Sequence, residues 1–121
     1  HTYARGRRTQ NLRQGVNARS PAGGTVYVNS VSGAKMYEIK PDRWSDFDRV
    51  EMERGAENTQ LYQVVHVGAD TLEYRSYTAT GTLYDAFNLI RQPDGPSEMG
   101  ELPVANRPER THENTLEYTR P

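Results

Sequence analysis

The strongest constraint on the fold lies in residues 60–92. Three runs rich in aliphatic and aromatic residues, 60–67, 71–79 and 83–91, are separated by the short links "GAD" and "TGT". Short runs joined by glycine-containing links are typical of β-hairpins. The pattern therefore predicts an antiparallel meander of three strands. Its apolar contacts are expected from Leu61, Leu72, Tyr74, Phe87 and Leu89.

A second pattern, "SDFDRVEMERG" at residues 45–55, has residues typical of the two ends of a short helix. Ser45 is a suitable N-cap, and Asp48 three residues later can return the capping hydrogen bond. Gly55 can close the helix at its C-terminal end. Together with the meander, this segment predicts an α+β chain that is mainly antiparallel sheet with one short helix.

The composition limits what this chain can bury. Only 34% of its 121 residues are hydrophobic, whereas globular chains usually reach about 45%. The core is therefore expected to be thin and to resemble part of a larger core. The chain has no cysteine, which excludes disulfides and thiolate metal sites. No apolar run approaches the roughly 20 residues of a membrane span, so no membrane-spanning segment is predicted.

Charge is distributed unevenly along the chain. Residues 1–37 contain six basic residues and no acidic one, whereas all 16 acidic residues lie in residues 38–121. A basic segment can attract phosphate groups, or it can simply be a solvated loop. No aromatic residue is interleaved between Arg5 and Arg19, although surfaces that bind single strands use such residues. No nucleic-acid partner is therefore predicted.

The sequence contains no complete catalytic constellation. It has no glycine-rich phosphate loop, no His-Glu-x-x-His pair and no Gly-x-Ser-x-Gly elbow. Its three histidines, His1, His66 and His112, are far apart in the sequence. The residues alone therefore identify no catalytic side chain.

Three segments together carry a family resemblance. They are "HTYAR" at the N-terminus, "GTVYVNSVSGAKMY" and "TLEYRSYTATGTLYDAFNLIRQ". The first resembles the end of the last signature block of the calcineurin-like metallophosphoesterases, Gly-His-x-His, in the form with x-Tyr-x-Arg that is typical of purple acid phosphatases. The other two resemble the strand and loop, and the closing hairpin, that follow this block. The resemblance covers residues 1–92, and residues 93–121 are predicted to form a proline-rich acidic tail.

The resemblance implies a fold and an activity. It implies that residues 1–92 form the C-terminal part of a four-layer metallophosphoesterase sandwich. Two metal ions (Fe, Zn or Mn) would activate a hydroxide that hydrolyses a phosphate ester. His1 would be a metal ligand, and Tyr3 and Arg5 would be packing and loop-anchoring residues of the motif. The remaining ligands belong to blocks absent from this sequence, so an N-terminal remainder of the same protein would be needed. The resemblance also implies an extracellular or periplasmic protein.

Two other interpretations remain open. The chain could be a non-catalytic, β-rich interaction module that uses its apolar meander and acidic tail. Alternatively, the amine and imidazole of a free N-terminal His1 could bind a single copper ion. The copper site would need a second histidine nearby, either His66 or His112.

Overall fold

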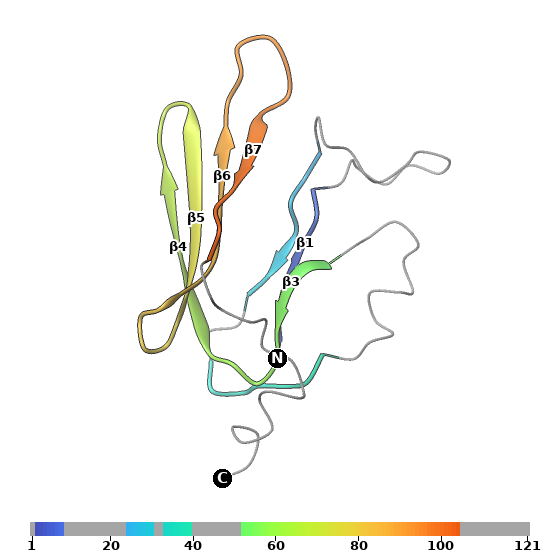
Figure 1. Cartoon of the computed structure of the whole chain (residues 1–121), viewed down its shortest axis with the longest axis vertical. Coiled ribbons are helices and arrows are strands. Elements are labelled where there is room, and N and C mark those ends of the chain that lie inside the picture. The colour runs from blue at the N-terminus through green and yellow to red at the C-terminus, as the bar shows by residue number, and fades with distance from the viewer. Residues whose placement is uncertain (1, 9–23, 31–32, 40–51, 105–121) are drawn as a thin grey trace, which may run out of the picture.

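The computed structural model describes residues 2–8, 24–30, 33–39 and 52–104. Within these ranges the chain forms seven strands in two antiparallel sheets and contains no helix (Figure 1). The described residues contain no helix that is long and apolar enough to cross a membrane.

The predicted meander is confirmed. Strands β4 (Leu61–Val67), β5 (Thr71–Thr78) and β6 (Leu83–Ile90) are consecutive antiparallel neighbours in a four-stranded sheet. The pairing aligns Val65 with Tyr74 and Tyr74 with Phe87. The turn between β5 and β6 contains Gly81 at φ 87°, a backbone conformation that glycine adopts without steric cost.

The fourth strand of this sheet is β7 (Glu98–Glu101), which pairs with β6. It lies inside residues 93–121, to which the sequence analysis assigned no strand. The segment "EMGE" is short and acidic at both ends, so its composition does not suggest a strand. Part of the predicted tail, Glu98–Glu101, therefore belongs to the sheet.

The second sheet has the order β2-β1-β3. Strand β1 (Tyr3–Gly6) is central, between β2 (Val28–Asn29) and β3 (Met52–Ala56). All four residues of β1 are buried. Tyr3, Ala4 and Arg5 of the N-terminal segment are therefore part of the interior of the fold.

The predicted helix is wrong over the part that the structure describes. Met52–Ala56 forms β3, so a helix does not extend to Gly55; residues 45–51 lie outside the described residues. Packing, and not helix capping, explains why glycine occupies position 55. A Cβ atom at this position would lie 2.7 Å from Ile39 Cδ1 and 2.9 Å from Met52 Sδ. Pairing with β1 outweighs the local capping pattern here.

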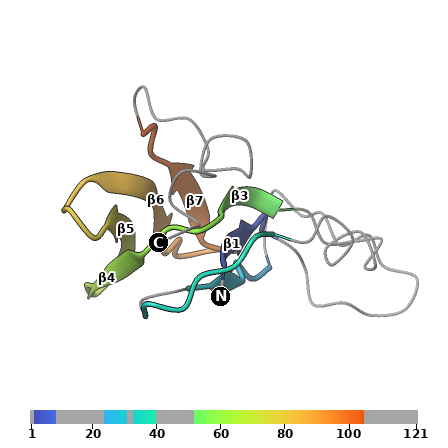
Figure 2. The same cartoon turned by 90° about the horizontal axis from the view of Figure 1, so that it is seen from below.

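The core lies between the two sheets, where β1 faces β6 and β7 (Figures 1 and 2). Aromatic rings supply most of its volume. Tyr74 stacks on Phe87 with 4.7 Å between ring centroids, and Tyr3 meets Tyr84 edge to face at 6.2 Å. The buried apolar cluster comprises Tyr3, Ala56, Leu61, Tyr74, Tyr84 and Phe87. Leu72 and Leu89 pack against it from its margin, as the pattern of the meander predicts.

Phe87→Ala should destabilise the fold by roughly 3–5 kcal/mol, because it removes a buried ring from a small core. Phe87 is 3% exposed and stacked on Tyr74. Denaturant unfolding followed by tyrosine fluorescence measures the change. Ile90→Ala is the control on the same strand, since Ile90 is 37% exposed. Equal losses in the two variants would contradict the assigned core.

Candidate functional site

Two of the residues that the sequence singled out, Tyr3 and Arg5, lie on β1 and are buried. Alternate residues of a strand share a face, so both side chains point from β1 towards the four-stranded sheet, where they meet Asp85. His1, the predicted metal ligand, lies outside the described residues.

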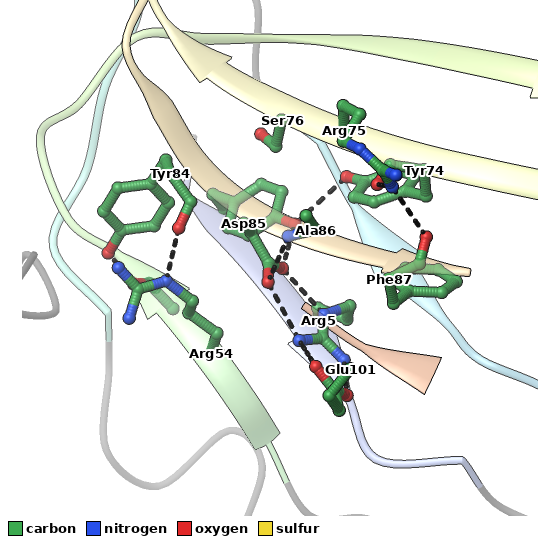
Figure 3. A network of polar contacts seen from close by, with 12 residues as sticks. Arg5, Arg54, Tyr74, Arg75, Ser76, Tyr84, Asp85, Ala86, Phe87 and Glu101 are labelled. Carbon is green, nitrogen blue, oxygen red and sulfur yellow. Dashed lines mark hydrogen bonds and ion pairs between the residues drawn. The ribbon is translucent and has the colours of Figure 1, made fainter. Parts of the chain in front are cut away.

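The Arg5 guanidinium binds two carboxylates (Figure 3). Its Nε donates to Asp85 Oδ2 at 2.7 Å and Nη2 donates to Asp85 Oδ1 at 2.8 Å. Nη1 and Nη2 donate to the two carboxylate oxygens of Glu101 at 2.7 and 2.9 Å. The guanidinium carbon also lies 5.1 Å from the centre of the Phe87 ring. One buried side chain therefore ties β1 to both β6 and β7.

The protonation of Arg5 follows from these contacts. Burial alone would lower the pKa of Arg5, since desolvation disfavours a charge. The hydrogen bonds to Asp85 and Glu101, together with their negative charges, outweigh burial and raise the pKa of Arg5 above its ordinary value. Arg5 is thus a permanent cation at 2% exposure, and its stability in the core depends on the two carboxylates.

Two tyrosines complete the network. Tyr3 Oη donates to Asp85 Oδ2 at 2.7 Å and lies 3.0 Å from Tyr74 Oη. Because Tyr3 has a single hydroxyl proton, Tyr74 donates to Tyr3 in this arrangement. Desolvation raises the pKa of Tyr3, and the charge of Asp85 raises it further. The pKa of Tyr74 is also raised, chiefly by desolvation.

The Asp85 carboxylate accepts four hydrogen bonds. Oδ2 accepts from Tyr3 and Arg5, and Oδ1 accepts from Arg5 and the Ala86 amide at 3.0 Å. The carboxylate is also almost fully buried. It is therefore suited to holding strands together and is poorly placed to bind a substrate or a metal.

A second guanidinium fixes β3 to the same strand. Arg54 Nε donates to the Tyr84 carbonyl at 2.8 Å, and its guanidinium carbon lies 4.1 Å from the centre of the Tyr84 ring (Figure 3). The Tyr84 hydroxyl donates back to the Gly55 carbonyl. Asp85 and Tyr84 are consecutive on β6, so one point of that strand holds both β1 and β3.

The first three basic residues each bind another part of the chain, and their exposure ranges from buried to exposed. Arg5 is buried, and Arg7 forms an ion pair with Glu53 at 2.7 Å. Arg8 donates to the Gly24 and Ser97 carbonyls. These three arginines bind other parts of the chain, and Arg13 and Arg19 lie outside the described residues.

The described residues provide no metal centre by themselves. No group of three or more His, Cys, Asp or Glu side chains that could hold a metal ion occurs among them. His66 is exposed on β4, across from Glu73. His1 and His112, which the copper interpretation would combine with it, lie outside the described ranges.

Sequence reasoning did not identify Asp85 and Glu101 as partners of Arg5. Asp85 did stand within the Tyr84–Phe87 run that carries the resemblance in the closing hairpin. The hydrogen bonds of Asp85 join that run to the "HTYAR" segment. The resemblance of both segments to one family was therefore the sequence signal that could have suggested this pairing. Comparison of the chain with protein-family models, with curated proteins and with solved structures finds no match.

Asp85→Ala should cost about 3–5 kcal/mol of stability, because it leaves the buried Arg5 charge without its main partner. Denaturant unfolding measures this loss. Arg7→Ala is the control, since Arg7 and Glu53 form an exposed pair whose loss is expected to cost no more than about 1 kcal/mol. The double variant Arg5→Met/Asp85→Leu should recover much of the loss, because it removes both charges together. A double variant no better than Asp85→Ala would contradict this account.

Stability should also fall at alkaline pH. Below pH about 10, tyrosine is protonated in both the folded and the unfolded chain. Above it the unfolded chain loses protons that Tyr3 and Tyr74 keep, because folding raises the pKa of both. The free energy of unfolding then drops by about 1.4 kcal/mol per pH unit for each such tyrosine.

Unfolding measured from pH 9 to pH 12, a range chosen around the ordinary tyrosine pKa of about 10, tests this dependence. Tyr3→Phe and Tyr74→Phe should each flatten the slope. Tyr27→Phe supplies the matched control, since Tyr27 is 52% exposed. The explanation fails if the two buried-site variants keep the native slope.

Proposed function

We propose that this chain is part of a metal-dependent phosphoesterase domain of the calcineurin-like type. One observation carries the proposal. Tyr3 and Arg5 match the signature block, Asp85 lies in the matching run of the closing hairpin, and these three residues bind one another directly. Segments that resemble one family in separate stretches of the sequence thus meet in one buried network.

In this proposal His1 is a metal ligand, and Tyr3 and Arg5 anchor the strand that follows it. Among the described residues no group of three or more His, Cys, Asp or Glu side chains could hold a metal by itself. The other ligands would come from an N-terminal remainder of the protein, in the four-layer arrangement that the resemblance implies. When bound, the two metal ions (Fe, Zn or Mn) would supply an activated hydroxide. The resemblance also favours an extracellular or periplasmic protein.

The proposed substrate is a phosphate ester. The basic residues near the signature block do not select among esters, since Arg5, Arg7 and Arg8 are engaged within the chain. Monoester, diester and nucleotide substrates therefore fit the proposal equally well.

A second candidate is the non-catalytic β-rich interaction module. It is favoured by β4, which has a neighbour on only one side among the described residues and exposes Val65 and Val67 at 48% and 76%. If the full-length protein showed no phosphatase activity but bound a partner protein through β4, this candidate would be favoured over the first.

His1→Ala in the full-length natural protein should reduce turnover of an aromatic phosphomonoester or diester by about 100-fold or more. Even residues that only support a metal ligand are typically worth 10–100-fold. Bound metal, measured by elemental analysis, should fall together with activity. Circular dichroism should remain native, because the change removes a ligand and no core volume. Arg7→Ala and Arg8→Ala should change turnover much less.

The 121-residue chain alone provides the second arm of this test. It should hydrolyse no phosphate ester, because one histidine cannot replace a two-metal site. Normal metal content and turnover in the His1→Ala protein, or turnover by the chain alone, would contradict the proposal.

A further inference from the structure

Among the residues that the structure describes, the four-stranded sheet has an edge strand that lacks the usual protective features. β4 lies at one end of the order β4-β5-β6-β7 and spans the seven residues Leu61–Val67. It contains no proline and no Asp, Glu, Lys or Arg. Charges, proline and short length are the devices that normally keep edge strands from pairing with other chains.

The other edges among the described residues carry such devices. β2 has only two residues, and β3 contains Glu53 and Arg54. β7 has four residues and a glutamate at each end, Glu98 and Glu101. Two copies of β7 would bring like charges together, whereas two copies of β4 would not. Within the described part of the chain, β4 is therefore the edge best suited to self-pairing.

The hydrogen bonds of β4 show which of its backbone groups point to β5 and which point to the open edge. The Ala79 amide donates to the Gln60 carbonyl at 3.2 Å, and the Gly68 amide donates to the Thr71 carbonyl at 2.8 Å. Every second residue of an antiparallel strand bonds to the same neighbour, and the β4–β5 register is regular between these two bonds. The even-numbered residues of β4 therefore bond to β5. The amides and carbonyls of the odd-numbered ones point to the open edge, namely Leu61, Gln63, Val65 and Val67.

This set of groups is self-complementary. An antiparallel pair of two β4 strands with the two-fold axis at Val64 aligns Leu61 with Val67 and Gln63 with Val65 of the other copy. Each of these pairs joins odd-numbered residues, so all the outward groups can bond at once. The axis also coincides with the midpoint of the strand. Full-length pairing and correct hydrogen-bond direction thus occur in the same register.

Side-chain exposure agrees with this pairing. Val65 and Val67 are 48% and 76% exposed, and Tyr62 is 42% exposed. In the symmetric register the exposed Val67 lies beside Leu61 of the other copy, which is buried in its own core at 2% exposure, and Tyr62 lies beside the exposed His66 of the other copy. Cross-strand apolar and aromatic pairs of this kind stabilise sheets.

We propose that β4 is a homodimerisation strand: two copies of this chain pair antiparallel through Leu61–Val67, with the two-fold axis at Val64. The two four-stranded sheets then become one continuous sheet. A single strand pair forms a small interface, so the dimer is reversible and depends on concentration. This inference does not rest on the proposed phosphoesterase function.

Cross-linking tests the register directly, because the chain has no cysteine of its own. In the dimer the two Val64 residues form a non-hydrogen-bonded pair with Cα atoms about 4.5 Å apart, within the range that a disulfide spans. Val64→Cys should therefore form a disulfide-linked dimer on mild oxidation. The two Val67 residues are about 20 Å apart in this register, so Val67→Cys should form far less, although Val67 is the more exposed residue. Equal or faster cross-linking of Val67→Cys would overturn the proposal.

Sedimentation velocity of the 121-residue chain over a range of concentrations provides the second measurement. The native chain should shift from monomer to dimer as concentration rises. Val65→Pro should remain monomeric, because it removes an outward amide while leaving the β4–β5 hydrogen bonds in place. Val65→Thr is the matched control and should still dimerise, since it keeps the amide.

Should Val65→Pro fail to fold, the cysteine pair decides alone. A native chain that stays monomeric throughout would overturn the proposal. So would a folded Val65→Pro chain that associates like the native one.

Discussion

The fold depends on a charge placed where charge is costly. Arg5 is 2% exposed, and it lies between two sheets that are otherwise joined mainly by aromatic rings. Moving an isolated guanidinium out of water costs several kcal/mol, which only well-placed carboxylates can offset. Asp85 and Glu101 meet that requirement with four hydrogen bonds of 2.7–2.9 Å. Any packing that separates β1 from β6 would leave this cation buried without partners, so the ion pair favours one arrangement of the sheets over its alternatives.

The aromatic core is consistent with this polar centre. Tyr3, Tyr74 and Tyr84 bury their rings and still present a hydroxyl group to a partner. A tyrosine therefore supplies apolar area to a thin core and hydrogen bonds to the network at the same time. A chain with 34% hydrophobic residues can in this way close a core from a few large rings. The same choice makes the core sensitive to alkaline pH, which an aliphatic core would not be.

Sequence periodicity was sufficient for the part of the fold that depends on local signals. The meander follows from alternation and glycine-containing links, and β4, β5 and β6 match the predicted runs closely. Gly55 shows where local signals fail, because its role depends on Ile39 and Met52 in the folded chain. β7 was missed because its pairing with β6 provides the reason for its extension, and its composition does not. The same limit applies to the buried network around Arg5. Tyr3 and Arg5, which the sequence singled out, are buried in the network, but their partner Asp85 is 80 positions from Arg5, beyond any periodic pattern.

The uneven distribution of charge along the sequence is partly explained by contacts within the folded chain. Residues 1–37, with six basic residues and no acidic one, precede a remainder that holds all 16 acidic residues, and this pattern suggests, on its own, an arm that attracts external anions. In the folded chain its first arginines instead bind acids and carbonyls from the later part: Arg5 binds Asp85 and Glu101, and Arg7 binds Glu53. The N-terminal segment and the acidic remainder are thus electrostatic complements within one chain. Their attraction favours insertion of β1 between β2 and β3 and against β6. Contacts within the chain therefore account for the placement of Arg5, Arg7 and Arg8, the basic residues of this segment closest to the N-terminus.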